Sequence, residues 1–340
     1  MLSCCLAYSQ QAESDDSRGC FSIVPRLEIN TVPSSVTGSG TKLDFGNTSL
    51  YSFLDGEFGT GFSYSASFHW LSTDPKPLYT NSFRTDDVTW VDWANITYEV
   101  NGWSFTLGKD AIVTGGFEFD GNDVDMHYAL CTTMWHDLPV YQWGGKVAYT
   151  LPSETSTFAL QVATSPFTEK LFNNSLLCYT LSWLGEFDGY SSRWSTTAMP
   201  MGEGETLSIT SLGNMLSLGD LTLGLDVSLF NTYGAKLTDC DFYANLTAGY
   251  NFGDKVELGL KGGYQTRNVV DDFFGYEGLD YAALIVPCGI SEQKDYFFGG
   301  LYLHYFPIED LRLHFVAAAN NYANAPSFSI GAVYYLNFNF

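Results

Sequence analysis

The last fourteen residues of the chain alternate between apolar and polar side chains and end on a phenylalanine. The polar face carries Ser, Gly, Asn and Tyr, with Val333 as the exception. The apolar face carries Phe328, Ile330, Ala332, Tyr334, Leu336, Phe338 and Phe340. Successive side chains of a strand point to opposite faces. The pattern therefore predicts a long strand with one apolar side and one wet side.

The same period of two recurs in residues 60–72, 219–230, 240–252 and 255–266. The polar positions include charged residues such as Asp226, Glu257 and Lys261 as well as hydroxyl groups. Unpaired charges are costly in a dry core, whereas a water-filled interior accepts them. The apolar positions would then face lipid, where every backbone group must be paired in a closed sheet.

We expect an all-β fold, a transmembrane β-barrel of sixteen antiparallel strands. The expected strands are 21–29, 48–57, 60–72, 91–101, 103–111, 139–151, 155–164, 174–184, 188–198, 205–215, 219–230, 240–252, 255–266, 294–306, 310–321 and 327–340. Short turns alternate with longer connections, and outer-membrane barrels show this asymmetry between periplasmic turns and external loops. Sixteen strands are enough to leave an aqueous channel.

Composition narrows the class of protein further. No run of about 18 apolar residues occurs, which argues against a transmembrane helix. The formal net charge is −23, from 38 acidic and 15 basic residues. Few basic groups are available to neutralise phosphates, so we expect no nucleic-acid partner. Cations or positively charged solutes fit this charge better.

The chain shows no linker or change in composition that would divide it. Residues 1–19 are interpreted as an export-signal remnant or an N-terminal tail, and residues 20–340 as a single barrel domain. The seven cysteines show no paired spacing, so we expect no structural metal and no cofactor. Cys240 and Cys288 fall near neighbouring external loops, where a disulfide would fit.

The third long connection, residues 111–138, is acidic and contains no Lys or Arg. Its acids are Glu118, Asp120, Asp123, Asp125 and Asp137, and it also holds His127 and His136. Folded into the lumen, it would form an acidic constriction. The alternative is that these acids face outward and stay hydrated. His127, His136 and the surrounding acids could bind a divalent metal, and the alternative there is a solvated polar loop.

Basic residues on the expected inner face would lie opposite an acidic loop. The candidates are Lys146, Arg193, Lys261 and Arg312. Opposed charges create a transverse field that discriminates between dipolar solutes. Each candidate could equally pair within the wall, with Glu99, Asp226 or Glu257 as partners.

The segment Asn101-Gly-Trp-Ser-Phe-Thr-Leu-Gly-Lys109 is a tight turn, a strand and then a long loop. It resembles the region before the constriction loop of sixteen-stranded porins, especially the phosphate-selective porin O and P group. The aromatic C-terminal strand is similar to that of porins generally. This resemblance implies the outer membrane of a Gram-negative bacterium, contact with outer-membrane lipid and lipopolysaccharide, and a homotrimer.

The chain departs from that group at its pore. Basic residues select anions there, whereas the loop of this chain is acidic, so phosphate selectivity is not carried over. We predict a porin for passive diffusion of small hydrophilic solutes, cation-preferring or weakly selective. The constriction is predicted to consist of Glu118, Asp120, Asp123, Asp125, Lys146, Lys261 and Arg312. The alternative is a scaffold barrel of a larger cell-envelope complex, with a plugged pore.

Catalysis has little support in the sequence, so we predict a protein that is not an enzyme. No GxSxG, HExxH or phosphate-binding glycine pattern occurs. His136 and Asp137 are the only adjacent His–Asp pair, and neighbouring side chains on a strand point apart.

Overall fold

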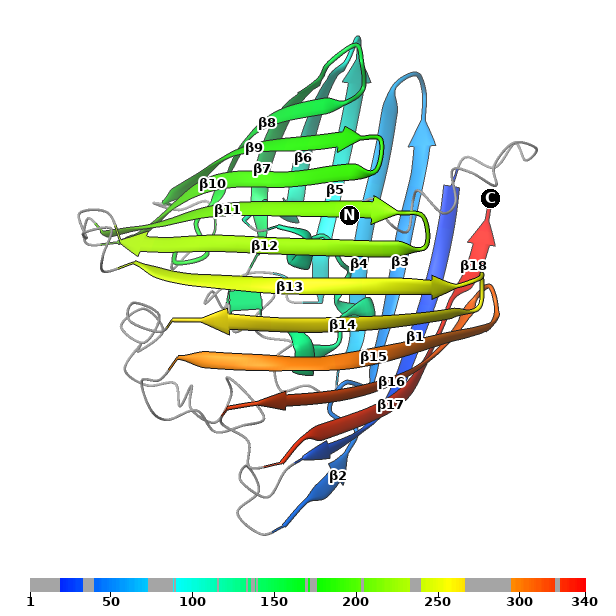
Figure 1. Cartoon of the computed structure of the whole chain (residues 1–340). Helices are drawn as coiled ribbons and strands as arrows, with labels where there is room; N and C mark the ends of the chain where they lie inside the picture. The colour runs from blue at the N-terminus through cyan, green and yellow to red at the C-terminus, as the bar shows by residue number, and fades with distance from the viewer. Residues whose placement is uncertain are drawn as a thin grey trace.

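The computed structural model describes residues 19–32, 40–72, 88, 90–114, 116–132, 134–135, 138, 140–168, 171, 176–202, 205–232, 240–266, 295–321 and 325–340. In these ranges the chain forms one antiparallel sheet that curls into a barrel (Figure 1). No helix in the described ranges is long and apolar enough to cross a bilayer.

Strands follow one another around the barrel in chain order. They are β1 (Gly19–Val32), β2 (Lys42–Asp44), β3 (Ser49–Phe58), β4 (Phe62–Ser72), β5 (Val91–Val100), β6 (Trp103–Ala111), β7 (Tyr141–Thr150), β8 (Ser156–Thr164), β9 (Leu177–Phe187), β10 (Tyr190–Gly202), β11 (Glu205–Leu218), β12 (Leu221–Thr232), β13 (Asp241–Phe252), β14 (Val256–Gln265), β15 (Tyr296–Ile308), β16 (Leu311–Asn320), β17 (Ser327–Tyr334) and β18 (Leu336–Asn339).

These eighteen segments make a wall of sixteen strands. β17 and β18 are separated by Tyr335 alone and pair with successive parts of β1, so they form one wall strand. The three-residue β2 pairs with the end of β1 and lies beyond the main wall. The predicted fold, a closed antiparallel barrel of sixteen strands, is confirmed.

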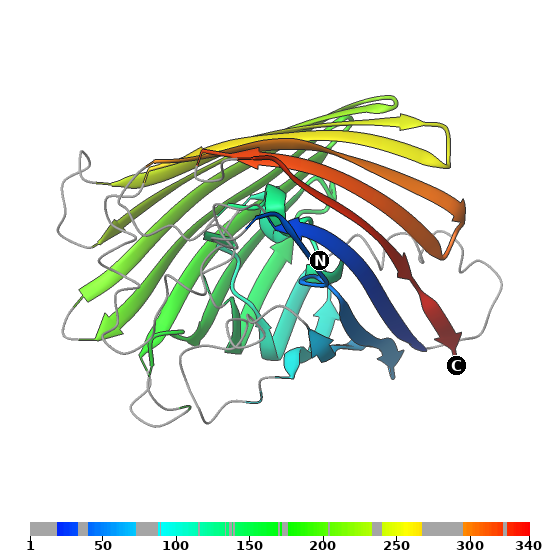
Figure 2. The same cartoon turned by 90° about the horizontal axis from the view of Figure 1, so that it is seen from below.

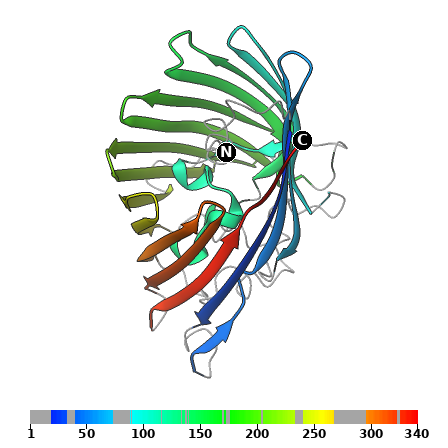
Figure 3. The same cartoon turned by 90° about the vertical axis from the view of Figure 1, so that its right-hand side faces the viewer.

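The first and last strands close the barrel. Gly19 and Phe340 exchange two backbone hydrogen bonds of 3.0 Å, and further along Arg26 lies opposite Val333. β1 and β17 run side by side in the end-on view (Figure 3). A closed sheet pairs the backbone groups that an open edge would expose to lipid.

Two predicted turns lie too early in the chain. The expected strands leave turns at 185–187 and 216–218, but β9 continues to Phe187 and β11 continues to Leu218. The chain reverses at Asp188–Gly189 and at Gly219–Asp220. Gly189 and Gly219 have φ angles of 71° and 63°, which glycine adopts without steric cost. The Asn101–Gly102 turn lies where it was predicted.

The two faces of the wall differ in polarity as the period of two predicted. Leu246 and Ile330, on the outer face, are 64% and 62% exposed, whereas the inward Asn245 is buried. Val333, the exception in the C-terminal strand, is also buried and packs inside the barrel against Val24. Its side chain therefore belongs to an apolar cluster within the lumen.

The connection from β6 to β7, residues 112–140, folds into the barrel interior (Figures 2 and 3). We call it the constriction loop. It carries three short 3-10 turns, η1 (Phe117–Phe119), η2 (Asp123–Asp125) and η3 (Tyr128–Leu130). Each of the three turns is anchored to the wall at a different place.

Candidate pore constriction

Polar side chains of the wall hold the beginning of the constriction loop. Gln161 on β8 donates to the carbonyl of Ala111 at 2.9 Å and accepts from the amide of Val113 at 3.2 Å. Thr197 on β10 donates to the Val113 carbonyl at 3.2 Å. Ser211 on β11 donates to the carbonyl of Thr114 at 2.6 Å. The loop backbone is thus paired with side chains as it crosses these strands.

Asp226 on β12 anchors η1. Its two carboxylate oxygens accept hydrogen bonds from the amides of Phe117 at 3.0 Å and Glu118 at 2.9 Å. These amides begin a helical turn and have no partner within it. The approach is close because Gly116 faces Gly213 on β11, where an added Cβ would lie 2.7 Å from the Gly116 Cα.

Glu118 joins the constriction loop to the wall, and it also joins two parts of the loop to each other. Its carboxylate lies 2.7 Å from Lys261 Nζ on β14. It also accepts from the amide of Thr132 at 3.0 Å and from the Thr132 hydroxyl at 2.5 Å. The Glu118 side chain is fully buried, so it is a structural link between two parts of the loop and the wall.

Two further loop acids lie against wall arginines. Asp120 accepts from Arg193 Nε on β10 at 2.7 Å, and Arg193 also lies 2.6 Å from Glu186. Asp125 accepts from Arg312 on β16 at 2.7 Å and from the Tyr335 hydroxyl at 2.6 Å. These pairs fix the loop to two different strands of the wall.

The tip of the loop reaches β1. Arg26 donates to the carbonyls of Val124 and Met126 at 3.0 and 2.8 Å, and its guanidinium pairs with Glu28. Val124 is buried in an apolar cluster with wall residues that include Tyr51. Asp123, next to it, is half-buried. The tip is therefore held by packing as well as by hydrogen bonds.

Three histidines meet where η2 leads into η3. His127 in the loop and His304 on β15 have their Nε2 atoms 2.7 Å apart. His304 Nδ1 lies 2.9 Å from Glu257 on β14. His314 on β16 lies 2.8 Å from Glu28, and its ring centroid is 5.3 Å from that of His127. No spacing in the sequence indicates this cluster, because its three histidines come from three separate segments.

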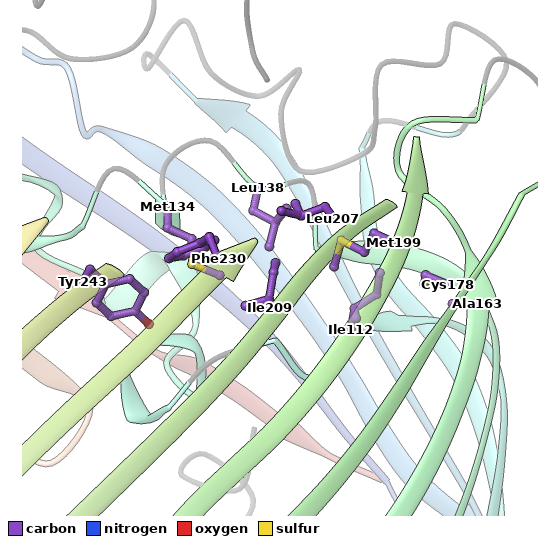
Figure 4. Packing of buried hydrophobic residues seen from close by; sticks show 10 residues of the cluster. All are labelled: Ile112, Met134, Leu138, Ala163, Cys178, Met199, Leu207, Ile209, Phe230 and Tyr243. Atoms are coloured by element: carbon purple, nitrogen blue, oxygen red, sulfur yellow. The ribbon is translucent and has the colours of Figure 1, made fainter. Parts of the chain in front are cut away.

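The return of the loop to β7 is apolar. Met134 and Leu138 are buried with inward-facing wall residues from β8 to β13 (Figure 4). Those wall residues are Ala163, Cys178, Met199, Leu207, Ile209, Phe230 and Tyr243. Ionic anchors hold the middle of the loop, and this apolar cluster holds its end.

The remaining predicted residues are placed as follows. Lys146 on β7 lies 2.7 Å from Asp110 on β6, and hence near the start of the loop. His136, Asp137 and Cys288 lie outside the described residues, so the metal and disulfide hypotheses that involve them stay predictions. Within the described residues, no group of three or more His, Cys, Asp or Glu is arranged to hold a metal ion.

Negative charge exceeds positive charge around the loop. The groups named above comprise five basic and nine acidic side chains, an excess of four negative charges with neutral histidines. They are Arg26, Lys146, Arg193, Lys261 and Arg312 against Glu28, Asp110, Glu118, Asp120, Asp123, Asp125, Glu186, Asp226 and Glu257. The described groups around the loop therefore carry a net negative charge.

One His–Asp contact within the described residues is not indicated by any spacing in the sequence. His69 Nδ1 on β4 lies 2.6 Å from Asp92 on β5, and Ser67 donates to the other Asp92 oxygen at 3.3 Å. A nucleophilic serine needs its hydroxyl against the imidazole. Here the carboxylate lies between the two, so this arrangement does not activate Ser67.

Solved structures with the same fold include outer-membrane porins and channels. An anion-selective porin from Comamonas acidovorans has a TM-score of 0.59 and 10% identity, over 94% of this chain and 100% of that one. A loop L8 deletion mutant of OmpT, an outer membrane protein of Vibrio cholerae, has a TM-score of 0.57 and 12% identity, over 95% of this chain and 100% of that one. The outer membrane channel DcaP of Acinetobacter baumannii has a TM-score of 0.54 and 12% identity, over 95% of this chain and 99% of that one. No family model and no curated protein sequence matches the chain. At these identities the likeness shows the fold, a barrel of the outer-membrane porin type.

Proposed function

We propose that this protein is an outer-membrane porin that lets small hydrophilic solutes diffuse passively through its lumen. One observation supports this function above the others: the constriction loop lies inside a closed barrel and is anchored to the wall along its length. A loop that served only as an external docking surface would not need these internal anchors.

The charges around the loop support a preference for cations over anions. Glu118, Asp120, Asp123 and Asp125 set the field of the constriction, with Lys146, Lys261 and Arg312 as counter-charges. Because several acids pair with these bases, the selectivity comes from the net excess of negative charge. We do not extend the proposal to phosphate, since an acidic constriction repels that anion.

The membrane environment belongs to the same proposal. An apolar outer face and a closed sheet suit the outer-membrane bilayer, with lipid and lipopolysaccharide around the wall. One solved OmpT structure of Vibrio cholerae is described as a trimer form, and it has a TM-score of 0.56 with this chain. We propose a homotrimer here too. The size of the detergent-solubilised protein tests this proposal, and a purely monomeric particle contradicts it.

Planar-bilayer recording in a KCl gradient tests the channel. We expect stepwise conductance with a reversal potential biased toward K⁺. Replacing the four loop acids by their amides should shift the reversal potential toward Cl⁻. The matched control removes four exposed turn acids, with Glu154→Gln, Asp188→Asn, Asp220→Asn and Asp254→Asn. An equal shift in both variants contradicts the loop as filter, and a silent barrel supports the scaffold alternative.

A further inference from the structure

The contact between His127 and His304 depends on how many protons the two rings carry. Their Nε2 atoms are 2.7 Å apart, so one nitrogen must donate and the other must accept. His304 is held in place by Glu257 at its other nitrogen. If both Nε2 atoms carry a proton, the contact becomes a repulsion between two donors.

The surroundings of His127 oppose a second proton. Arg26 from β1 donates to the Val124 carbonyl and Arg312 from β16 donates to Asp125, both in the loop just before His127. The titratable and charged groups around His127 are Arg26 and Glu28 of β1, Glu257 of β14, Tyr302 and His304 of β15, Arg312 and His314 of β16, and Asp125 and Tyr128 of the loop. Glu257 already pairs with His304, and Glu28 already pairs with His314.

Burial, together with His304, Arg26, Arg312 and His314, holds the pKa of His127 well below its ordinary value of 6.5. The docked loop therefore binds fewer protons at His127 than a released loop would. By linkage, docking is strongest above pH 6.5 and weakens as the pH falls below that value.

We propose that the His127–His304 contact is a proton-sensitive latch on the constriction loop, which releases residues 127–131 from β15 as the pH falls. This inference rests on the proposed function, because the latch alters the conducting path. Arg26 and Arg312 hold Val124, Asp125 and Met126 before His127, and Glu118 holds Thr132 after it. Residues 127–131, between these anchors, are therefore the part that moves.

Hydrogen exchange of the folded barrel measures the latch directly. Protection of residues 127–131, corrected for intrinsic rates, is compared at about pH 7.5 and about pH 5.5, a range in which histidine titrates. Because release takes up a proton, we expect protection to fall by up to about tenfold per pH unit. His127→Gln keeps a hydrogen-bonding side chain without the titration and should flatten this response. His304→Gln should do the same.

The matched control is His69→Gln, since His69 lies on the wall against Asp92 and is neither ring of the His127–His304 contact. It should keep the wild-type response. Single-channel recordings should show additional gating events at the lower pH in the wild type and in His69→Gln only. An identical pH response in the wild type, His127→Gln and His304→Gln overturns the latch. A barrel that conducts but lacks this pH response contradicts the latch and leaves the channel function standing. A silent barrel contradicts the channel function, and hydrogen exchange alone then tests the latch.

Discussion

Lys261 on β14 and Glu118 in the constriction loop form an ion pair with 2.7 Å between Nζ and Oε1, and the Glu118 side chain is fully buried. The two residues are 143 positions apart in the sequence. This pair, and the hydrogen bonds of Glu118 to Thr132, make the loop part of the barrel interior.

Lys261→Met should loosen the loop more than the double variant Glu118→Gln with Lys261→Met. The single change leaves a buried carboxylate without its cation, which typically costs about 3–5 kcal/mol, whereas the double change removes both charges. Hydrogen exchange over residues 116–132 measures this difference. Equal protection in the single and double variants would show that the pair does not hold the loop.

Asp226→Asn should weaken the anchor of η1. One oxygen still accepts from Phe117, but the new amide group faces the amide of Glu118, donor against donor. Leaving a buried donor unsatisfied costs about 1–3 kcal/mol. The hydrogen-exchange rate of the Glu118 amide should rise in this variant. Asp220→Asn, an exposed acid in the turn before the same strand, should leave that exchange unchanged, and a rise in both would contradict the anchor.

Gly213→Ala should displace the beginning of the loop. The added Cβ would lie 2.7 Å from Asp226 Oδ1 and 2.7 Å from the Gly116 Cα, and overpacking of this kind costs about 1–3 kcal/mol. Gly249→Ala is the matched control, because its nearest neighbour would be 3.8 Å away. Comparable loop protection in the two variants would contradict the close approach.

Leu225→Arg and Thr222→Arg, both on β12, test which face of the wall meets lipid. Leu225 points outward and is 41% exposed, whereas Thr222 belongs to the inward-facing set with Asp226. An arginine on the lipid face costs about 2–4 kcal/mol near the bilayer midplane, but an aqueous interior hydrates it. Folding titrations into lipid vesicles measure the cost. Equal stability of the two variants would contradict an apolar outside and a wet inside.

The fold was predictable because its main signal is local. Alternation along each strand, as in the C-terminal segment, reports which face is apolar without any knowledge of the neighbours. The turns at Asp188–Gly189 and Gly219–Asp220 were misplaced because apolar residues continue up to them. Val333 broke the pattern because it belongs to an apolar cluster inside the barrel, which also includes Val124 of the loop.

The site was predictable only in its residue types. An acidic loop without basic residues was visible in the sequence, and so were the basic candidates on the wall. Which acid meets which base was not, because Arg312 and Asp125 are 187 positions apart. The burial of Glu118, the anchor at Asp226 and the His127–His304 contact depend on the folded path of the loop, which no periodic pattern encodes.

Replacing residues 116–132 by a short Gly-Ser linker tests the central claim most directly, because it removes the loop from the lumen and leaves the wall strands intact. We predict a larger single-channel conductance than that of the wild type, together with a weaker preference for K⁺. An unchanged conductance and an unchanged reversal potential would contradict the claim that this loop forms the constriction.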